Sequence, residues 1–463
     1  MAEPTQTRCA RCGKLEIRVR ELEAQLAALR KNSSNSSKPP SSDIVKPPKP
    51  PTRGRPRKRK RGGQPGHPRH QRPAFTSEEL DAAWDYSLDA CPDCGGTLED
   101  SDAAPRVVQQ VEIVERPIRI EEHRGLAHWC PACRKVHYAP LPREVRKAGL
   151  VGPRLTALVG YLKGACHASF STIRKFLRDV VGVPISRGQL AKLVQKVSAS
   201  LEASYDELWA ALPTQRQLNI DETGHRDSGQ GLWTWCFRAS LFTLFKIDRS
   251  RGSEVLLAAL GQEFDGLLGC DYFSAYRKYM RLNEKVAVQF CPAHFIRDVK
   301  FLVKHPNRAN RRYGEMLLGH LRKLFRTIHR RDEFASPASF RKALSAVRNA
   351  LVGDAIVHLP NTREAGNLAD RFVDHYDSYF RFITEPEIDP TNNLAEQAIR
   401  FVAIHRRVTQ GTRGERGQRW CERIWTVLAT CAQQGRSAFH FLNAAVEAHF
   451  QQVPGPRLLF DSS

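Results

Sequence analysis

RQLNIDETGHR, residues 216–226, contains a strand-like run that ends on an acidic residue, Asp221. The next two segments, LWTWCFRAS at 232–240 and LFTLFKIDRSRG at 241–252, are rich in aromatic and β-branched residues and predict two more strands. SEVLLAALG, residues 253–261, predicts a short helix. The chain is therefore expected to form three consecutive strands and a helix, with an acid at the end of the first strand.

A fourth strand is predicted within FDGLLGCDYFSAY, residues 264–276, and it delivers Asp271 at its C-terminal end. Three strands, a helix and a further strand is the opening order of an RNase H-like fold, in which the first and fourth strands lie side by side. Asp221 and Asp271 would then be neighbours. Two carboxylates at that distance repel each other unless a cation lies between them, and hard oxygen ligands of this kind bind Mg²⁺. Taken alone, either residue could equally be an ordinary acid at the edge of a loop.

A third candidate acid lies in TNNLAEQAIR, residues 391–400. Asn393 followed three residues later by Glu396, just before an apolar run, predicts a helix start at which the acid caps a backbone N–H. A helix that begins there could also bring Glu396 to the two aspartates as a third metal ligand. The pattern leaves both roles open.

Between Asp271 and Glu396 lie 124 residues, far more than a strand and a connector need. Apolar residues recur there at four-three-four spacing in three sets, which predicts three amphipathic helices and thus an all-helical insertion. The sets are Leu317, Leu321, Leu324 and Ile328; Phe340, Leu344, Val347 and Leu351; and Phe372, Tyr376, Tyr379 and Ile383. The basic segments RANRR (308–312) and RTIHRR (326–331) would face DNA or simply solvent.

The composition indicates a polyanionic partner. The 463 residues include 72 Lys and Arg against 49 Asp and Glu, a formal net charge of +23, so nucleic acid is the first expectation and an anionic membrane surface the second. A chain of this length predicts roughly two to four domains. It contains no apolar run of about 18 residues and no apolar signal core at its start, which predicts a soluble cytosolic protein whose twelve cysteines are reduced or metal-bound.

The densest positive charge falls between residues 46 and 72, which hold eleven Lys and Arg and no acid. This Pro- and Gly-rich run cannot pack a core and predicts a disordered linker. Within it, GRPRK (54–58) resembles an AT-hook, in which basic side chains enter a narrow minor groove. The residues concerned are Arg55, Arg57 and Lys58, and a generic polybasic tether is the alternative.

Two pairs of cysteines, Cys91 with Cys94 and Cys130 with Cys133, have the Cys-x2-Cys spacing of zinc knuckles. Two such pairs complete a closed tetrahedral site of the structural zinc type. The alternating segment RVVQQVEIVERPIRIEEHRG, residues 106–125, predicts a β-hairpin that would bring the pairs together. The alternative is four buried reduced cysteines.

The N-terminal region predicts a helix with an apolar seam of about two heptads between residues 15 and 29. Its positions are Leu15, Val19, Leu22, Leu26 and Leu29, and the helix would either dimerise as a coiled coil or act as an ordinary amphipathic helix. Cys9 and Cys12 have no second pair nearby and are expected to be unligated.

The segment from Ser171 to Val197 predicts a helix-turn-helix: a helix over 171–181, a turn at 182–184, and a second helix opened by Ser186 with Gln189 at the capping-box position. The second helix would present four polar side chains to phosphates or base edges. They are Arg187, Gln189, Lys192 and Lys196. Plain helical packing also produces this shape, and the overall charge favours DNA contact.

Taken in order, the motifs resemble those of transposases of the insertion sequence 66 family over residues 14–445. They are NSSNSSKPPSSD (32–43), GGQPGH (62–67), the double Cys-x2-Cys unit, IDETG (220–224), CDYFSAY (270–276), CPAHFIRD (291–298), TNNLAEQAIR (391–400) and RGQRWCERIWTVLATCAQQGRS (416–437). Two local departures are Pro292, where an aromatic residue is frequent, and the stretch VTQGTRGERGQRW (408–420), which resembles one subgroup.

The resemblance implies a DDE-type recombinase whose triad is Asp221, Asp271 and Glu396, with Mg²⁺ or Mn²⁺ as catalytic cofactor. His294 would position the scissile phosphate or hold the helix start, with Arg297 auxiliary to it, and Arg400 would contact DNA or pair with the triad. Expected partners are double-stranded DNA, further copies of the chain and accessory proteins of the same element. The expected location is the bacterial cytoplasm, at the nucleoid.

The predicted fold is therefore a multidomain α+β chain. Its expected parts are a coiled-coil helix (1–31), a disordered basic linker (32–75), a zinc-binding β module (76–145), a helix-turn-helix region (146–212), an RNase H-like catalytic domain in two parts (213–303 and 385–445), an all-helical insertion (304–384) and a C-terminal tail (446–463). A zinc-containing DNA-binding repressor and a nuclease that cuts without joining are the alternative functions, although a repressor would not explain three acids in this order.

Overall fold

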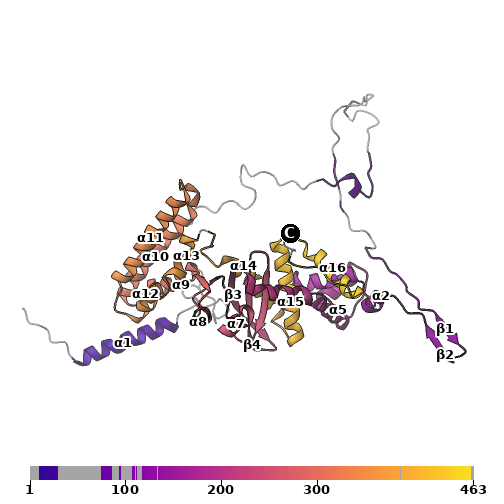
Figure 1. Ribbon diagram of the computed structural model, residues 1–463, viewed down its shortest axis with the longest axis horizontal. Helices are drawn as coiled ribbons and strands as arrows, with labels where there is room; N and C mark the ends of the chain where they lie inside the picture. Colours follow the sequence, from indigo (N-terminus) through magenta and orange to yellow (C-terminus); the bar gives the residue numbers. More distant parts are fainter. Residues whose placement is uncertain are drawn as a thin grey trace, which may run out of the picture. The chain divides into compact units, whose positions relative to one another are not determined.

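The computed structural model describes residues 10–29, 74–85, 93–94, 107–109, 111, 117–132, 134–385 and 387–459. The protein is a mixed α+β structure, as its sequence predicts (Figure 1). The chain divides into two units, one formed by residues 48–121 and the other by residues 1–47 and 122–463. The second unit holds the main sheet and all three candidate catalytic acids. Within the described ranges, every helix is too short or too polar to span a membrane.

The main sheet has five strands. They are β3 (Gln217–Asp227), β4 (Gln230–Arg238), β5 (Thr243–Asp248), β6 (Leu267–Cys270) and β7 (Ala287–Phe290). Their order across the sheet is β5-β4-β3-β6-β7; β3, β4 and β5 are antiparallel neighbours, whereas β3, β6 and β7 run parallel. Helix α7 (Ser253–Leu260) joins β5 to β6. The first and fourth strands are therefore neighbours, which is consistent with the predicted RNase H-like domain.

Helix α15 (Glu415–Gln433) covers the free edge of β5. The side chains of Glu422, Thr426 and Thr430, successive turns apart, accept backbone N–H groups of the strand. The donors are alternate residues, Ile247, Phe245 and Thr243, at 2.7, 3.0 and 3.1 Å. Four residues of helix rise about 6.0 Å and two residues of strand about 6.6 Å, so the two spacings match. An edge strand normally leaves such groups unpaired, and here a helix satisfies them.

A run of helices leads directly into the main sheet. They are α2 (Arg143–Ala148), α3 (Pro153–Gly164), α4 (Phe170–Asp179), α5 (Arg187–Ser200) and α6 (Glu202–Ala211). The chain turns between α4 and α5 at Gly182, where φ is 77°. The Ser186 hydroxyl accepts the N–H of Gln189 at 3.1 Å and starts α5 as predicted. The helix-turn-helix shape is thus present, and its contact with DNA stays a prediction.

Helix α8 (Ser274–Leu282) precedes β7, and α9 (Pro292–Val303) leads from it to the helical insertion. The insertion consists of α10 (Arg308–His329), α11 (Pro337–Val357), α12 (Arg363–Asp374) and α13 (Tyr376–Thr384). The predicted seams pack inward, with Leu317, Leu324 and Leu351 fully buried. The third predicted helix, with Phe372 to Ile383 as its apolar set, is divided into two helices, α12 and α13. The division lies at His375, whose φ of −138° and ψ of 35° interrupt the helical backbone.

The C-terminal segment is not a tail. Helix α16 (Ala438–Gln451) packs on α3 and α5 and continues past residue 445. Val446, Phe450 and Leu458 are buried, so residues 446–459 belong to the folded body.

The N-terminal helix α1 (Ala10–Leu29) includes the predicted seam. Four seam side chains are 48–58% exposed: Leu15, Val19, Leu22 and Leu26. The helix is as predicted, and its pairing as a coiled coil stays a prediction.

A second, two-stranded sheet includes Cys130. Strands β1 (Ala127–Cys130) and β2 (Lys135–Tyr138) are antiparallel. The sequence placed a hairpin earlier, at 106–125, but the described positions of that range form no strand. Cys133 lies outside the described residues, as do Cys9, Cys91 and the linker residues Arg55, Arg57 and Lys58.

Candidate active site

The two candidate aspartates come from neighbouring parallel strands. The register pairs Leu218 with Leu268 and Asn219 with Gly269, so Asp221 lies level with Asp271. Parallel strands are about 4.8 Å apart. Asp221 is half-buried in β3, and Asp271, directly after β6, is 7% exposed. The strand order therefore brings the two residues together, while their catalytic role stays a prediction.

The aspartates share an electrostatic environment with two glutamates. Burial raises the pKa of Asp221 well above its usual range, and the charges of Glu222, Asp271 and Glu396 raise it further. Burial also raises the pKa of Asp271 to about 7, with Glu222 adding to the shift. Each aspartate accepts one backbone N–H, from Glu222 at 3.0 Å and from Phe273 at 2.9 Å. Anions that repel one another away from water give this pattern.

Glu396 lies in the first turn of α14 (Asn393–Thr409). The helix cap is Asn392 and makes no side-chain capping bond, so the predicted capping box of Asn393 and Glu396 is wrong. The Asn392 amide instead donates to the Ile220 carbonyl at 2.7 Å and accepts from Asn219 Nδ2 at 3.0 Å. This buried bridge fixes the start of α14 to β3. The Glu396 carboxylate is left available for another role.

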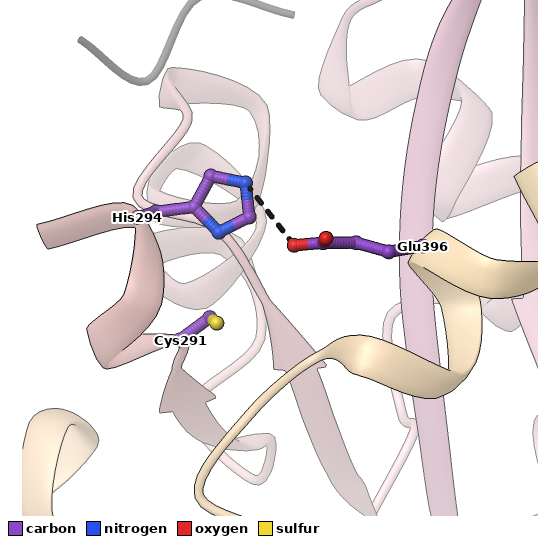
Figure 2. Close-up of side chains that lie close together, drawn as sticks. All are labelled: Cys291, His294 and Glu396. Atoms are coloured by element: carbon purple, nitrogen blue, oxygen red, sulfur yellow. Dashed lines mark ion pairs between the residues drawn. The ribbon is translucent and has the colours of Figure 1, made fainter. Parts of the chain in front are cut away.

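Glu396 points toward the start of α9 (Figure 2). Its Oε1 lies 3.6 Å from His294 Nε2 and 3.6 Å from Arg297 Nη2, and this oxygen is buried without a hydrogen-bond partner. Cys291, the cap of α9, accepts the Asn392 N–H on its Sγ at 3.3 Å. In the described part of the chain, Cys291, His294 and Glu396 form the one trio of His, Cys, Asp or Glu ligand atoms within 4.8 Å of one another.

His294 is neutral at pH 7. Burial and then the charge of Arg297 lower its pKa to about 3. Its contact with Glu396 is therefore not an ion pair, and the charge partner of Glu396 is Arg297. The three triad carboxylates do not themselves converge within 4.8 Å among the described residues. Glu396 lies against the guanidinium of Arg297 instead.

Glu396 is thus a member of two candidate ligand sets. Asp221, Asp271 and Glu396 offer only carboxylate oxygens, which suit Mg²⁺ or Mn²⁺. Cys291 and His294 add sulfur and imidazole nitrogen on the other side of Glu396, a softer set that suits Zn²⁺.

Glu222 is a residue of this site that sequence analysis did not single out. It is 3% exposed, accepts from Arg251 Nε and Nη2 at 2.9 and 2.7 Å, and accepts from the Tyr276 hydroxyl at 2.6 Å. The guanidinium of Arg251 lies over the Phe273 ring, 3.7 Å from its centroid. Glu222 thus ties β3 to the segment after Asp271. The adjacent acids of IDETG were the signal in the sequence that could have indicated Glu222. The sequence does not show which of the two acids is buried and paired with an arginine.

The candidate DNA-contact residues separate into two groups. Arg187 and Lys192 are exposed and Gln189 is half-buried on α5, and Arg400 is exposed on α14 with no ion pair to a triad carboxylate among the described residues. Lys196 differs, because its ammonium donates to the carbonyls of Lys147 and Ala148 at 2.7 and 3.0 Å and lies 5.4 Å from the Phe450 ring centroid. Lys196 therefore connects α5 to α2 and α16, and its contact with DNA stays a prediction.

Comparisons with known proteins identify the family of this chain. A family model described as transposase IS66 family matches residues 148–419, and one described as a family of unknown function (DUF6444) matches residues 3–73. Two uncharacterized proteins of Sinorhizobium fredii (strain NBRC 101917 / NGR234) are similar to the chain. They are y4hP, 22% identical over 377 residues, and y4qI, 22% identical over 348 residues. The matches cover 74% and 68% of this chain and 67% and 63% of those proteins. Because the first family model spans more than half of the chain and all three candidate acids, the protein belongs to the IS66 family of transposases.

Proposed function

We propose that this protein is a DDE transposase that binds the terminal inverted repeats of its insertion sequence and catalyses metal-dependent DNA cleavage and strand transfer. The observation that supports the proposal is that three acids from separate elements share one electrostatic environment: Asp221 on β3, Asp271 after β6 and Glu396 on α14. Membership of a transposase family supports a role in transposition in general.

The residues fit a catalytic divalent cation. All three side chains offer hard oxygen ligands, Glu396 Oε1 is buried without a hydrogen-bond partner, and burial followed by neighbouring carboxylates raises the pKa values of Asp221 and Asp271. When bound, two Mg²⁺ or Mn²⁺ ions would lower the pKa of an attacking water and stabilise the leaving 3′ oxygen.

The chain's own side chains would perform the remaining tasks. Arg297 and Arg400 would bind backbone phosphates near the scissile bond, since guanidinium groups pair with phosphate in a fixed geometry. Neutral His294 would hold the Glu396 carboxylate in place without neutralising its negative charge, which would remain for the cation. The same site would then orient the freed 3′-OH of the element toward target DNA, so a covalent enzyme intermediate is not required.

The test is a cleavage and joining assay on duplexes that carry the element's ends. Asp221→Asn, Asp271→Asn and Glu396→Gln keep side-chain size and should each abolish cleavage and joining while leaving DNA binding nearly unchanged. Glu387→Gln, an exposed acid shortly before α14, is the matched control and should keep activity. Near-normal joining by Glu396→Gln would contradict its role as a ligand. Cleavage without joining by the wild type would instead indicate a nuclease, and binding without cleavage a repressor.

We also propose that Cys91, Cys94, Cys130 and Cys133 hold one structural Zn²⁺. Support comes from the β1–β2 pair, because Cys130 ends β1 just before the turn, as the first cysteine of a zinc knuckle does. Two ends of one element must be brought together for transposition, so we propose a homo-oligomer as the active form, with α1 as a candidate for pairing.

A further inference from the structure

A basic cleft lies about one length of α14 away from the candidate active site. Its volume is about 1040 Å³. One wall is the exposed side of α5, and the other is formed by the end of α14, the loop at 410–414 and the start of α15. Among the residues that the structure describes, five cationic side chains line it and no Asp or Glu does: Lys163, Lys192, Lys196, Arg413 and Arg416.

Three histidines in the lining report the positive surroundings. The pKa of His167 is lowered by burial and then by Lys163, and that of His449 by burial and then by Lys147 and Lys196. Burial and neighbouring His167 and Lys163 lower the pKa of His405 to about 3. The cleft therefore favours an anion over a further cation.

The loop at 410–414, which carries Arg413 and leads into Arg416 at the start of α15, is anchored to β3. Thr412 donates its N–H to the Arg226 carbonyl at 2.9 Å and its hydroxyl to Asp227 at 2.7 Å, which ties the loop to the end of β3. Arg413 and Arg416 are exposed, and neither forms an ion pair with the acids that the structure describes. The anchored loop and the first turn of α15 thus present one unpaired guanidinium group each, Arg413 and Arg416, to the cleft that Lys192 of α5 also lines.

The spacing matches a run of DNA. From Glu396 to Thr409 α14 advances 13 residues, which is about 20 Å at 1.5 Å per residue. Successive phosphates of one strand are about 3.4 Å apart along the helix axis, so about six base pairs span this distance.

We propose that the cleft binds backbone phosphates of duplex DNA about six base pairs from the scissile phosphate, with Arg413, Arg416 and Lys192 as the contacts. This rests on the proposed function. The proposal also gives α5 a different role from the predicted one. One side of α5 would form a wall of the phosphate-binding cleft, and α5 would then not enter a major groove as a recognition helix.

The test compares two double variants with the same change of net charge. Arg413→Glu with Arg416→Glu alters the cleft, whereas Arg216→Glu with Lys278→Glu alters two exposed residues that do not line it. Binding of a 60-base-pair duplex of mixed sequence is followed by fluorescence anisotropy over a range of salt concentrations. Removing two phosphate-binding side chains should flatten the slope of log affinity against log salt by about 1.8 and weaken binding about 60-fold at 0.1 M salt. The control pair should keep the slope.

A second measurement places the contact on the DNA. On a duplex that ends at the cleaved element end, single neutral methylphosphonate linkages should weaken wild-type binding most about six nucleotides from the cut, and this effect should vanish in the cleft variant. Arg413→Gln with Arg416→Gln, which removes charge without reversing it, serves if the glutamate variant does not fold.

The failures of the two proposals are distinguishable. An unchanged salt slope in the cleft variants, or a methylphosphonate profile that the variants leave unaltered, overturns the cleft even if the triad variants lose cleavage. If the cleft variants flatten the salt slope but the wild-type protein neither cleaves nor joins DNA, the result supports phosphate binding by the cleft and overturns the proposed chemistry.

Discussion

Asp271→Asn is expected to make the metal-free protein more stable. Burial and the charge of Glu222 raise the pKa of Asp271 to about 7, above the ordinary value of 3.8. Because the pKa is higher in the folded state, the native protein binds more protons than the unfolded chain between about pH 4 and 7. The wild type therefore loses stability as the pH rises through this window, and an uncharged residue at 271 avoids the loss.

The magnitude follows from the shift. Three pKa units at about 1.4 kcal/mol each give about 4 kcal/mol at pH 8, where Asp271 is ionised in both states. Part of this is offset, because the carboxylate accepts the Phe273 N–H at 2.9 Å and an amide oxygen accepts it less strongly. We expect a net gain of about 1–4 kcal/mol at pH 8, and none below pH 4.

The assay is denaturant unfolding in the presence of a chelator, followed by the fluorescence of buried Trp235 and Trp425 at a series of pH values. Asp227→Asn on the same strand β3 is the control with the opposite sign. Burial alone would raise the pKa of Asp227, but hydrogen bonds from Thr412 and Gly414 outweigh it and lower the pKa, so this variant should lose stability above pH 4.

Mg²⁺ extends the test. At 100 times its dissociation constant it should stabilise the wild type by about 2.7 kcal/mol and the Asp271→Asn variant much less. A variant that is less stable than the wild type at pH 8, to the same degree as Asp227→Asn, would refute the idea that repulsion raises the pKa of Asp271.

Three further predictions concern other parts of the chain. Protein purified without chelator should contain about one Zn per chain, and Cys94→Ser should lose it and unfold the 76–145 module, whereas Cys166→Ser, an exposed cysteine outside the pairs, should keep it; zinc-free wild type by metal analysis would contradict the site. Deleting residues 46–72, with eleven Lys and Arg, should flatten the salt dependence of DNA affinity by about 0.9 for each phosphate that the run neutralises, and an unchanged slope would show that the run does not touch DNA. Thr426→Val leaves the Phe245 N–H buried and unpaired and should lower the free energy of unfolding by about 1–3 kcal/mol. The control Thr327→Val removes a solvent-exposed hydrogen bond within α10 and should cost less than about 0.5 kcal/mol; equal effects would mean that α15 does not secure the edge of β5.

The strands and their acids were predictable because local patterns determine them. The run 216–226 and the buried segment 264–276 carry their periodicity in the chain itself, and the order of elements then places β3 beside β6. The apolar seams of the insertion were predictable for the same reason, as Leu317 and Leu351 show by their full burial.

Features that depend on long-range partners were not predictable. Asn393 and Glu396 match a capping box by spacing, but Asn392 makes the bridge to β3 with Asn219, a residue 173 positions away. The position of Lys196 in the sequence fits a recognition helix, but its ammonium group donates to two backbone carbonyls of α2. The basic cleft joins α5 to a loop more than 200 residues later in the chain. None of these contacts is indicated by a repeating spacing of residue types in the sequence.

The identity of the third acid shows how much the structure adds. Glu422 is completely buried, but its oxygens are engaged by the Ile247 N–H at 2.7 Å and by Arg419 at 2.7 Å, so it belongs to the α15–β5 contact. Asp389 is exposed and accepts from its own turn, at Thr391. Glu396 differs from both, because its charge reaches Asp221 and its Oε1 is buried without a hydrogen-bond partner. Arg297 offsets the charge of Glu396 at 3.6 Å but makes no hydrogen bond to Oε1, so this oxygen can still accept a cation. Among the three acids Glu396 is therefore the best candidate for the third ligand, on physical grounds that are independent of the motif around it, and its role as a ligand stays a prediction.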